Sequence, residues 1–239
     1  MSSYFIYNNQ NSREFGLLES TPMPTPNDEI INTAETPGNI TDAYYATGRY
    51  AHQELQVVLG VSDKTKIRAI NEWLTGRGEL VFSDEPDKYY KVIRIEKTPE
   101  RMSVRFGKIN IAFTVEPFAY AVNPTEQNIT AATDYAEIPN SGTMFSAPEI
   151  RFIPAAETVV INTNGKDFEI NNLSEQVSNN DIVVVDSELS VVYYIRNNEK
   201  HDITYKSKYS FPLLHTENNY IKHNGNVSSM SINVRERWL

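Results

Sequence analysis

The chain has 239 residues, a formal net charge of −9 and a pI of about 5.0, so its length allows one or two domains. No run approaches the roughly 18 apolar residues of a membrane helix, no basic segment followed by an apolar stretch opens the sequence, and the absence of cysteine excludes disulfides, thiolate metal sites and cysteine nucleophiles. The acidic balance and the scattered basic residues argue against nucleic-acid binding, and we expect a chain that folds in a reducing cytoplasm without membrane insertion.

In the first half, apolar residues recur mostly with a period of two, which is the period of β-strands. The clearest strand spans residues 108–116, in which Ile109, Ile111, Phe113 and Val115 share one face and polar residues the other. Six further strands are expected in this half, at residues 4–7, 15–19, 29–34, 53–59, 79–82 and 90–96.

One segment follows the helical period instead. Ser62 or Asp63 can cap a helix there, and Gly76 can end it. The apolar residues at helical spacing are Ile67, Ile70 and Leu74. Trp73 lies beside them, and we expect it to pack the helix on a sheet rather than to bind a ligand.

Between residues 121 and 147 the periodicity disappears and turn dipeptides such as Asn123-Pro124 and Ser141-Gly142 appear. We therefore predict an N-terminal domain at residues 1–125, a linker at residues 126–147 and a C-terminal domain at residues 148–239. The first is expected to be a sandwich or barrel-like β domain with one helix.

The sequence of the second half predicts short strands connected by turns. Asn164-Gly165 predicts a tight hairpin, and Asp186-Ser187-Glu188 predicts a second turn. Strands are expected at residues 149–153, 158–163, 166–170, 181–186, 189–195, 219–222 and 227–235. So many short strands without a helix predict a β-sandwich or jelly roll.

A search for catalytic chemistry finds little. The four histidines, at positions 52, 201, 215 and 223, have no metal-ligand spacing, and no Gly-x-Ser-x-Gly elbow occurs. Residues 84–87, Asp-Glu-Pro-Asp, could ligate calcium through oxygen atoms, but the favoured interpretation is a turn between strands. Gly76-Arg77-Gly78 lacks the ending of a phosphate loop. No catalytic, cofactor-binding or metal-binding residue is predicted, and we expect no enzyme and no cofactor.

Tyrosine is the one enriched side chain, with 14 copies, including the pairs Tyr44-Tyr45, Tyr89-Tyr90 and Tyr193-Tyr194. Neighbours in a strand point to opposite sides, so each pair can place one ring in the core and one on a surface. Each surface ring either faces solvent or contacts other subunits or sugars, and the sequence does not choose between these alternatives.

Several runs together resemble a known family, the distal tail proteins, which are hub proteins of siphophages that infect Gram-positive bacteria. In the first half the resemblance lies in residues 70–83 (INEWLTGRGELVFS), Tyr89-Tyr90 and residues 113–120 (FTVEPFAY). In the second half it lies in residues 140–142, 147–150, 183–187 and 211–214. One departure is Thr216-Glu217-Asn218-Asn219, where the family has a Pro-Gly turn, so a longer turn or a left-handed Asn is expected there.

The resemblance implies a structural role at the tip of a phage tail, in a virion assembled in the host cytoplasm. Six subunits would form a ring around a DNA channel through their N-terminal domains, while a galectin-like C-terminal domain projects outward. The implied partners are the tail tube protein, a tail-associated fibre or lysin protein and receptor-binding proteins. Six copies would carry six times −9, about −54 charges, which suits a channel through which DNA slides.

The alternative function is a carbohydrate-binding adhesin that recognises cell-wall polysaccharide of the host. Fold kinship with galectins does not bring sugar binding with it. Galectin-type sites stack sugar on a tryptophan, and the two here are Trp73 in the expected helix and Trp238 beside the C-terminus. This argument does not favour a sugar site. A third class, a peptidoglycan hydrolase, lacks a nucleophile, a metal cluster and an acid pair.

Overall fold

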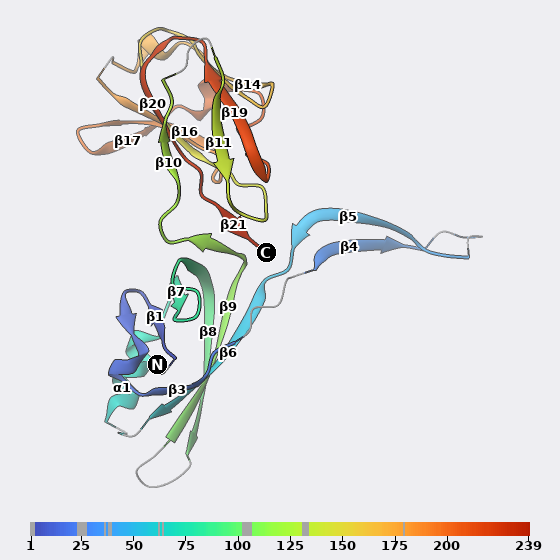
Figure 1. Cartoon of the computed structure of the whole chain (residues 1–239), viewed down its shortest axis with the longest axis vertical. Helices are drawn as coiled ribbons and strands as arrows, with labels where there is room; N and C mark the ends of the chain where they lie inside the picture. The colour runs from blue at the N-terminus through green and yellow to red at the C-terminus, as the bar shows by residue number, and fades with distance from the viewer. Residues whose placement is uncertain are drawn as a thin grey trace. The chain divides into compact units, whose positions relative to one another are not determined.

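The computed structural model describes residues 3–22, 28–35, 37, 40–61, 63, 65–101, 107–130, 134–178 and 180–239. The chain divides into two compact units, Met1–Val122 together with Leu239, and Asn123–Trp238. In both units antiparallel strands predominate, and α1 (Lys66–Trp73) is the only α-helix of the described part (Figure 1). The prediction of a mainly β protein with one helix in its first half is confirmed.

The main sheet of the first unit has its strands in the order β2-β1-β7-β8-β9-β6-β3. Their bounds are β1 Phe5–Tyr7, β2 Gln10–Asn11, β3 Leu17–Ser20, β6 Gln53–Val61, β7 Gly78–Phe82, β8 Lys88–Arg101 and β9 Gly107–Ala121. In β9 the side chains of Ile109, Ile111, Phe113 and Val115 are all buried, as the alternation predicts. A 3₁₀ turn, η1 (Ser12–Glu14), joins β2 to β3.

This sheet is bent. The register of β8 against β9 shifts between Tyr90 and Val92 and again between Val92 and Arg94. Such bulges bend a strand and increase its twist, so the two limbs of the sheet can face one another. The ring of Phe5 in β1 accordingly lies 5.5 Å from the ring of Phe113 in β9, edge to face. The core of the unit is therefore enclosed between the limbs of one sheet, in a sandwich-like way.

The N-cap of helix α1 lies two residues after Asp63, the later of its two expected capping positions. Thr65 is the N-cap, and the Asp63 carboxylate accepts hydrogen bonds from the Thr65 N–H and hydroxyl at 2.9 and 2.7 Å. Asp63 thus stabilises the turn that leads into the helix rather than capping it. Ser62, the other expected cap, lies outside the described residues. Gly76, at φ +78°, follows the helix end as predicted.

Trp73 packs in the first unit as the sequence predicts. Its ring stacks on Phe5 and Phe15, with centroids 5.4 and 4.7 Å away, and its Nε1–H donates to the Tyr7 carbonyl at 3.0 Å. Ile70 of the same helix is fully buried. The indole thus holds α1 against the sheet.

The second unit consists of two antiparallel sheets. One has six strands in the order β10-β20-β12-β15-β16-β17, and the other has five in the order β11-β19-β13-β14-β18. The bounds are β10 Glu126–Asn128, β11 Ala136–Asn140, β12 Glu149–Pro154, β13 Val159–Thr163, β14 Lys166–Ile170, β15 Ile182–Asp186, β16 Val191–Arg196, β17 Glu199–Asp202, β18 Ser207–Lys208, β19 Glu217–His223 and β20 Val227–Asn233. Short elements complete the unit: η2 Leu173–Glu175, η3 Thr204–Lys206 and β21 Arg237–Trp238. One hydrophobic cluster takes residues from both sheets, among them Phe152 and Phe168, so the predicted β-sandwich is confirmed.

The predicted linker at residues 126–147 is wrong. This segment contains β10, which pairs with β20, and β11, which pairs with β19, so it belongs to the second unit. Both strands are short and lie at sheet edges, where Pro139 is tolerated although it cannot donate a backbone hydrogen bond. Ile138 is nonetheless fully buried. Turn-forming residues in edge strands hide the period that identifies longer strands.

The Asn164-Gly165 turn joins β13 to β14 as predicted, with both residues at positive φ, +51° and +81°. The expected left-handed Asn near residue 218 is wrong, because Glu217 takes that conformation, at φ +74°. Asn219 is instead fully buried in β19. Its side chain accepts the His215 N–H at 2.8 Å and donates to the His215 carbonyl at 3.0 Å, so it closes the loop that precedes β19.

Candidate functional site

Strands β4 (Glu29–Ala34) and β5 (Ala43–Tyr50) form a separate two-stranded ribbon in the first unit, here called the arm. They pair with each other, and among the described residues neither pairs with a third strand. Figure 1 shows the arm extending from the start of β6 away from the main sheet. Cross-strand pairs such as Thr33 with Tyr44 and Asn32 with Tyr45 define its two faces.

Both faces of the arm carry exposed apolar side chains. Ile31 and Tyr44 lie on one face and are 55% and 76% exposed, whereas Ile30 and Tyr45 lie on the other and are 40% and 61% exposed. An isolated two-stranded hairpin is marginally stable in water and normally needs a third layer or strand. The arm therefore offers two apolar faces and two strand edges that no other described residue of the chain pairs with or buries.

The predicted tyrosine split holds at two of three pairs. Tyr90 is buried while Tyr89 stacks on Tyr120, 5.5 Å between centroids, and Tyr194 is buried while Tyr193 lies under Lys200. At Tyr44-Tyr45 both rings are exposed, because β5 has no core on either side.

The four histidines occupy separate places. His52 and His215 are exposed, and His201 stacks on Tyr194, 4.8 Å between centroids. His223 is buried, its Nδ1 accepts the Gly225 N–H at 3.0 Å, and burial lowers the pKa of its imidazole. Among the described residues no three His, Asp or Glu side chains gather as a metal site.

The acidic segment 84–87 forms the turn between β7 and β8. Asp84 accepts the Thr21 hydroxyl at 2.7 Å, and Glu85 binds the Lys88 ammonium at 2.9 Å and the Tyr90 hydroxyl at 3.2 Å. Burial and the Glu85 carboxylate raise the pKa of Tyr90 well above its usual value, so its hydroxyl stays a donor. These oxygens are engaged by the protein's own donors, which agrees with the favoured interpretation as a turn.

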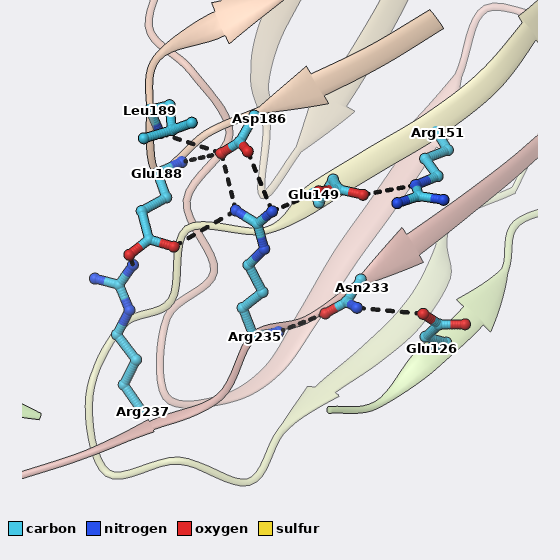
Figure 2. A network of polar contacts seen from close by, with 9 residues as sticks. All are labelled: Glu126, Glu149, Arg151, Asp186, Glu188, Leu189, Asn233, Arg235 and Arg237. Carbon is cyan, nitrogen blue, oxygen red and sulfur yellow. Dashed lines mark hydrogen bonds and ion pairs between the residues drawn. The ribbon is translucent and has the colours of Figure 1, made fainter. Parts of the chain in front are cut away.

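A network of ion pairs lies at one end of the six-stranded sheet in the second unit (Figure 2). Arg235 sits at its centre in a left-handed conformation, φ +54°. Its guanidinium binds both Asp186 oxygens, at 2.8 and 3.1 Å, and also contacts Glu149 and Glu188. Arg237 pairs with the same Glu188 at 3.4 Å.

The network connects the start of β12, the turn after β15 and the segment after β20. Asp186 also accepts the Glu188 and Leu189 N–H groups at 3.1 Å each, which fixes the turn after β15. Burial by itself would raise the pKa of Asp186, but its hydrogen bonds with Arg235 and these amides bring it below the usual value. The carboxylate therefore stays ionised at neutral pH and the network acts as a structural clasp for the segment after β20.

An open depression lies at the β17 edge of the same sheet. Its volume is about 630 Å³, and its lining residues are Glu175, Gln176, Tyr194, Arg196, Lys200, His201 and Asp202. Tyr194 and His201 are cross-strand partners and share one side of the β16–β17 hairpin. The Arg196 guanidinium lies over the Tyr194 ring, 5.0 Å from its centroid.

We expect the pair between Arg196 and the buried Asp181 to stabilise the fold at neutral pH and to be lost in acid. Hydrogen bonds from Arg196 lower the pKa of Asp181 to about 2. A lowered folded-state pKa gives stability that is present above the unfolded value of about 3.9 and lost as the pH falls toward 2. Asp181→Asn should therefore unfold at a lower temperature than the parent chain at pH 7, and the difference should shrink near pH 2. A difference that is the same at both pH values would contradict this assignment.

Comparisons with known proteins find similarity among solved structures. No protein-family model and no curated protein matches the sequence. Among solved structures, the crystal structure of the Dit protein (gp 19.1) of SPP1, described as a paradigm of the hub adsorption apparatus in phages that infect Gram-positive bacteria, matches with a TM-score of 0.77. The match covers 100% of both chains at 16% sequence identity, so this chain shares the fold of that protein over its whole length. No helix in the described part of the chain is long and apolar enough to cross a membrane.

Sequence reasoning missed the arm, the clasp and the depression. Residues 29–34 were expected to form a strand, but β5 was not, and nothing indicated that both would stand apart from the sheet. The sequence holds one signal for the arm, the two pairs of adjacent apolar residues Ile30-Ile31 and Tyr44-Tyr45. Adjacent residues of a strand point to opposite faces, so such pairs cannot all face one core.

Proposed function

We propose that this chain is a distal tail protein, a non-enzymatic structural component of the tail tip of a phage virion. The proposal is carried by the match over the full length of both chains to a hub protein, because the same family is reached independently from the sequence runs. The low identity means that the match speaks for the fold, and the role is our inference from the two together.

The proposed assembly is a hexameric ring, built chiefly by the first unit, that joins the tail tube to the baseplate or tail fibre and leaves a channel for DNA. The arm supports subunit contacts through this unit, since it exposes Ile31 and Tyr44 on one face and Ile30 and Tyr45 on the other. The net charge of −9 per chain supports a channel that repels DNA rather than retaining it.

The second unit is proposed to be galectin-like and to project from the ring. Its six-stranded and five-stranded sheets around one core support this assignment. The proposed partners are the tail tube protein, a tail-associated fibre or lysin protein and receptor-binding proteins, and the proposed site of assembly is the host cytoplasm.

Light scattering behind gel filtration tests the ring. We expect a mass of about 163 kDa, six times 27.2 kDa, or a multiple of it, at micromolar concentration. Because a ring can depend on its neighbours, the measurement is repeated in the presence of a tail tube protein, the proposed partner. A mass of one chain in both conditions would contradict the proposal.

A further inference from the structure

The depression at the β17 edge has side chains that the fold leaves available for a ligand. The Arg196 Nε and Nη2 atoms bind Asp181 and the Gln176 carbonyl, which leaves Nη1 to donate outward. The Gln176 side-chain oxygen accepts the Tyr205 hydroxyl at 3.0 Å, which leaves its NH₂ group to donate. The Glu175 side chain is 64% exposed although its carboxylate binds Lys206 at 2.9 Å.

An aromatic surface adjoins these polar groups. Tyr205 is 71% exposed, and its hydrogen bond to Gln176 holds it beside the depression. His201 stacks on Tyr194 and brings ring nitrogens that can donate and accept. An exposed aromatic ring next to fixed donors and acceptors presents an apolar face and a polar rim to one ligand.

The charges of the depression favour a neutral ligand. Of its charged lining residues, Arg196 is paired with Asp181 and Glu175 is paired with Lys206. The Lys200 ammonium lies over the Tyr193 ring, on the other side of the hairpin from Tyr194 and His201. A phosphate or carboxylate would therefore have to compete with Asp181 for Arg196. Hydroxyl groups both donate and accept, so neighbouring hydroxyls match a lining in which donors and acceptors are mixed. The volume of about 630 Å³ lies within the range of small-molecule sites.

We propose that this depression binds a neutral sugar residue of a glycan, with the sugar ring against Tyr205 and its hydroxyls on Gln176, Arg196 and His201. Neither tryptophan lines this depression, so a sugar there would contact other aromatic rings. Tyr194 of β16 and His201 of β17 line the depression, and Tyr205 of η3 adjoins it through its hydrogen bond to Gln176.

The test uses the full chain and amide NMR, with the methyl glycosides of glucose, galactose and N-acetylglucosamine as probes and glycerol phosphate as the anionic comparison. We expect at least one glycoside to shift the signals of Tyr194, His201 and Gln176, with a dissociation constant of about 1 mM. Tyr205→Ala and His201→Ala should weaken binding about fivefold or more. The matched control is Tyr209→Ala, since Tyr209 is similarly exposed, at 68%, whereas Tyr205 is the residue that binds Gln176 of the lining.

Three outcomes would overturn the proposal. One is no shift at this edge with any glycoside at about 20 mM, well above the expected dissociation constant. Another is equal weakening by Tyr205→Ala and Tyr209→Ala. The third is preferential, salt-sensitive binding of glycerol phosphate, which would make the depression an anion site. None of these concerns the ring, whose mass is measured without sugar, so a ring with an empty depression would refute the sugar site alone.

Discussion

Replacing Arg235 with alanine should lower the free energy of unfolding of the second unit by about 3 to 5 kcal/mol, the range for removing one partner of a buried ion pair. The side chain of Arg235 is 22% exposed, and those of its acceptors Glu149 and Asp186 are 11% and 8% exposed. Once Arg235 is removed, water can therefore solvate the charges of these two carboxylates only poorly. Urea unfolding, followed by the amide signals of β12 and β15, measures this loss.

Arg151→Ala is the matched control for this variant. Arg151 also pairs with Glu149, at 2.6 Å, but its side chain is 58% exposed. An exposed pair contributes about 1 kcal/mol or less, so this variant should be nearly as stable as the parent chain. Equal losses of unfolding free energy in Arg235→Ala and Arg151→Ala would show that the ion pairs of Arg235 stabilise the unit no more than the exposed pair of Arg151.

A second variant separates the ion pair from packing. Arg235→Met removes the charge of Arg235 but keeps much of its apolar volume. Asp186→Asn in the same chain removes the charge that Arg235 compensates, and its amide oxygen can still accept the Glu188 and Leu189 N–H groups. The double variant should therefore recover part of the stability that Arg235→Met alone loses. No recovery would assign the loss to packing rather than to an unpaired carboxylate.

Ile31→Ser with Tyr44→Ser should abolish the assembly expected of the parent chain, so that the mass falls from about 163 kDa toward 27.2 kDa. Both side chains lie on one face of the arm. A fully buried apolar side chain contributes about 1.5 to 3 kcal/mol, so their loss at every subunit contact weakens association more than a hundredfold, by about 3 kcal/mol or more. Light scattering across micromolar concentrations measures the shift.

The opposite face provides the comparison. Ile30→Ser with Tyr45→Ser removes the same residue types from the other side of the arm, so the two double variants report which face a neighbouring subunit covers. Leu189→Ser is the control outside the arm, since Leu189 is 69% exposed in the second unit. A ring that survives both arm variants would contradict a role for the arm in assembly, whereas the loss of the ring in Leu189→Ser would move the contact to the second unit.

Much of the fold was predictable because local physics determines it. Alternation placed Ile109 and Phe113 on the buried face of β9, helical spacing located α1, and Asn164-Gly165 predicted its hairpin from backbone conformations that few other residues adopt. The order of short runs along the chain resembles that of tail hub proteins, and the chain shares the fold of one solved protein of that kind.

Tertiary structure alone decided the surfaces on which function depends. Arg235 binds partners 49 and 86 residues away in sequence, and no spacing rule connects them. Alternation identifies the two faces of a strand but not whether either is covered, so it could not show that β4 and β5 leave the sheet. The sequence by itself determined the local elements and the core faces, because these depend on near neighbours. The clasp, the arm and the depression depend on long-range contacts, which exist only once the chain has folded.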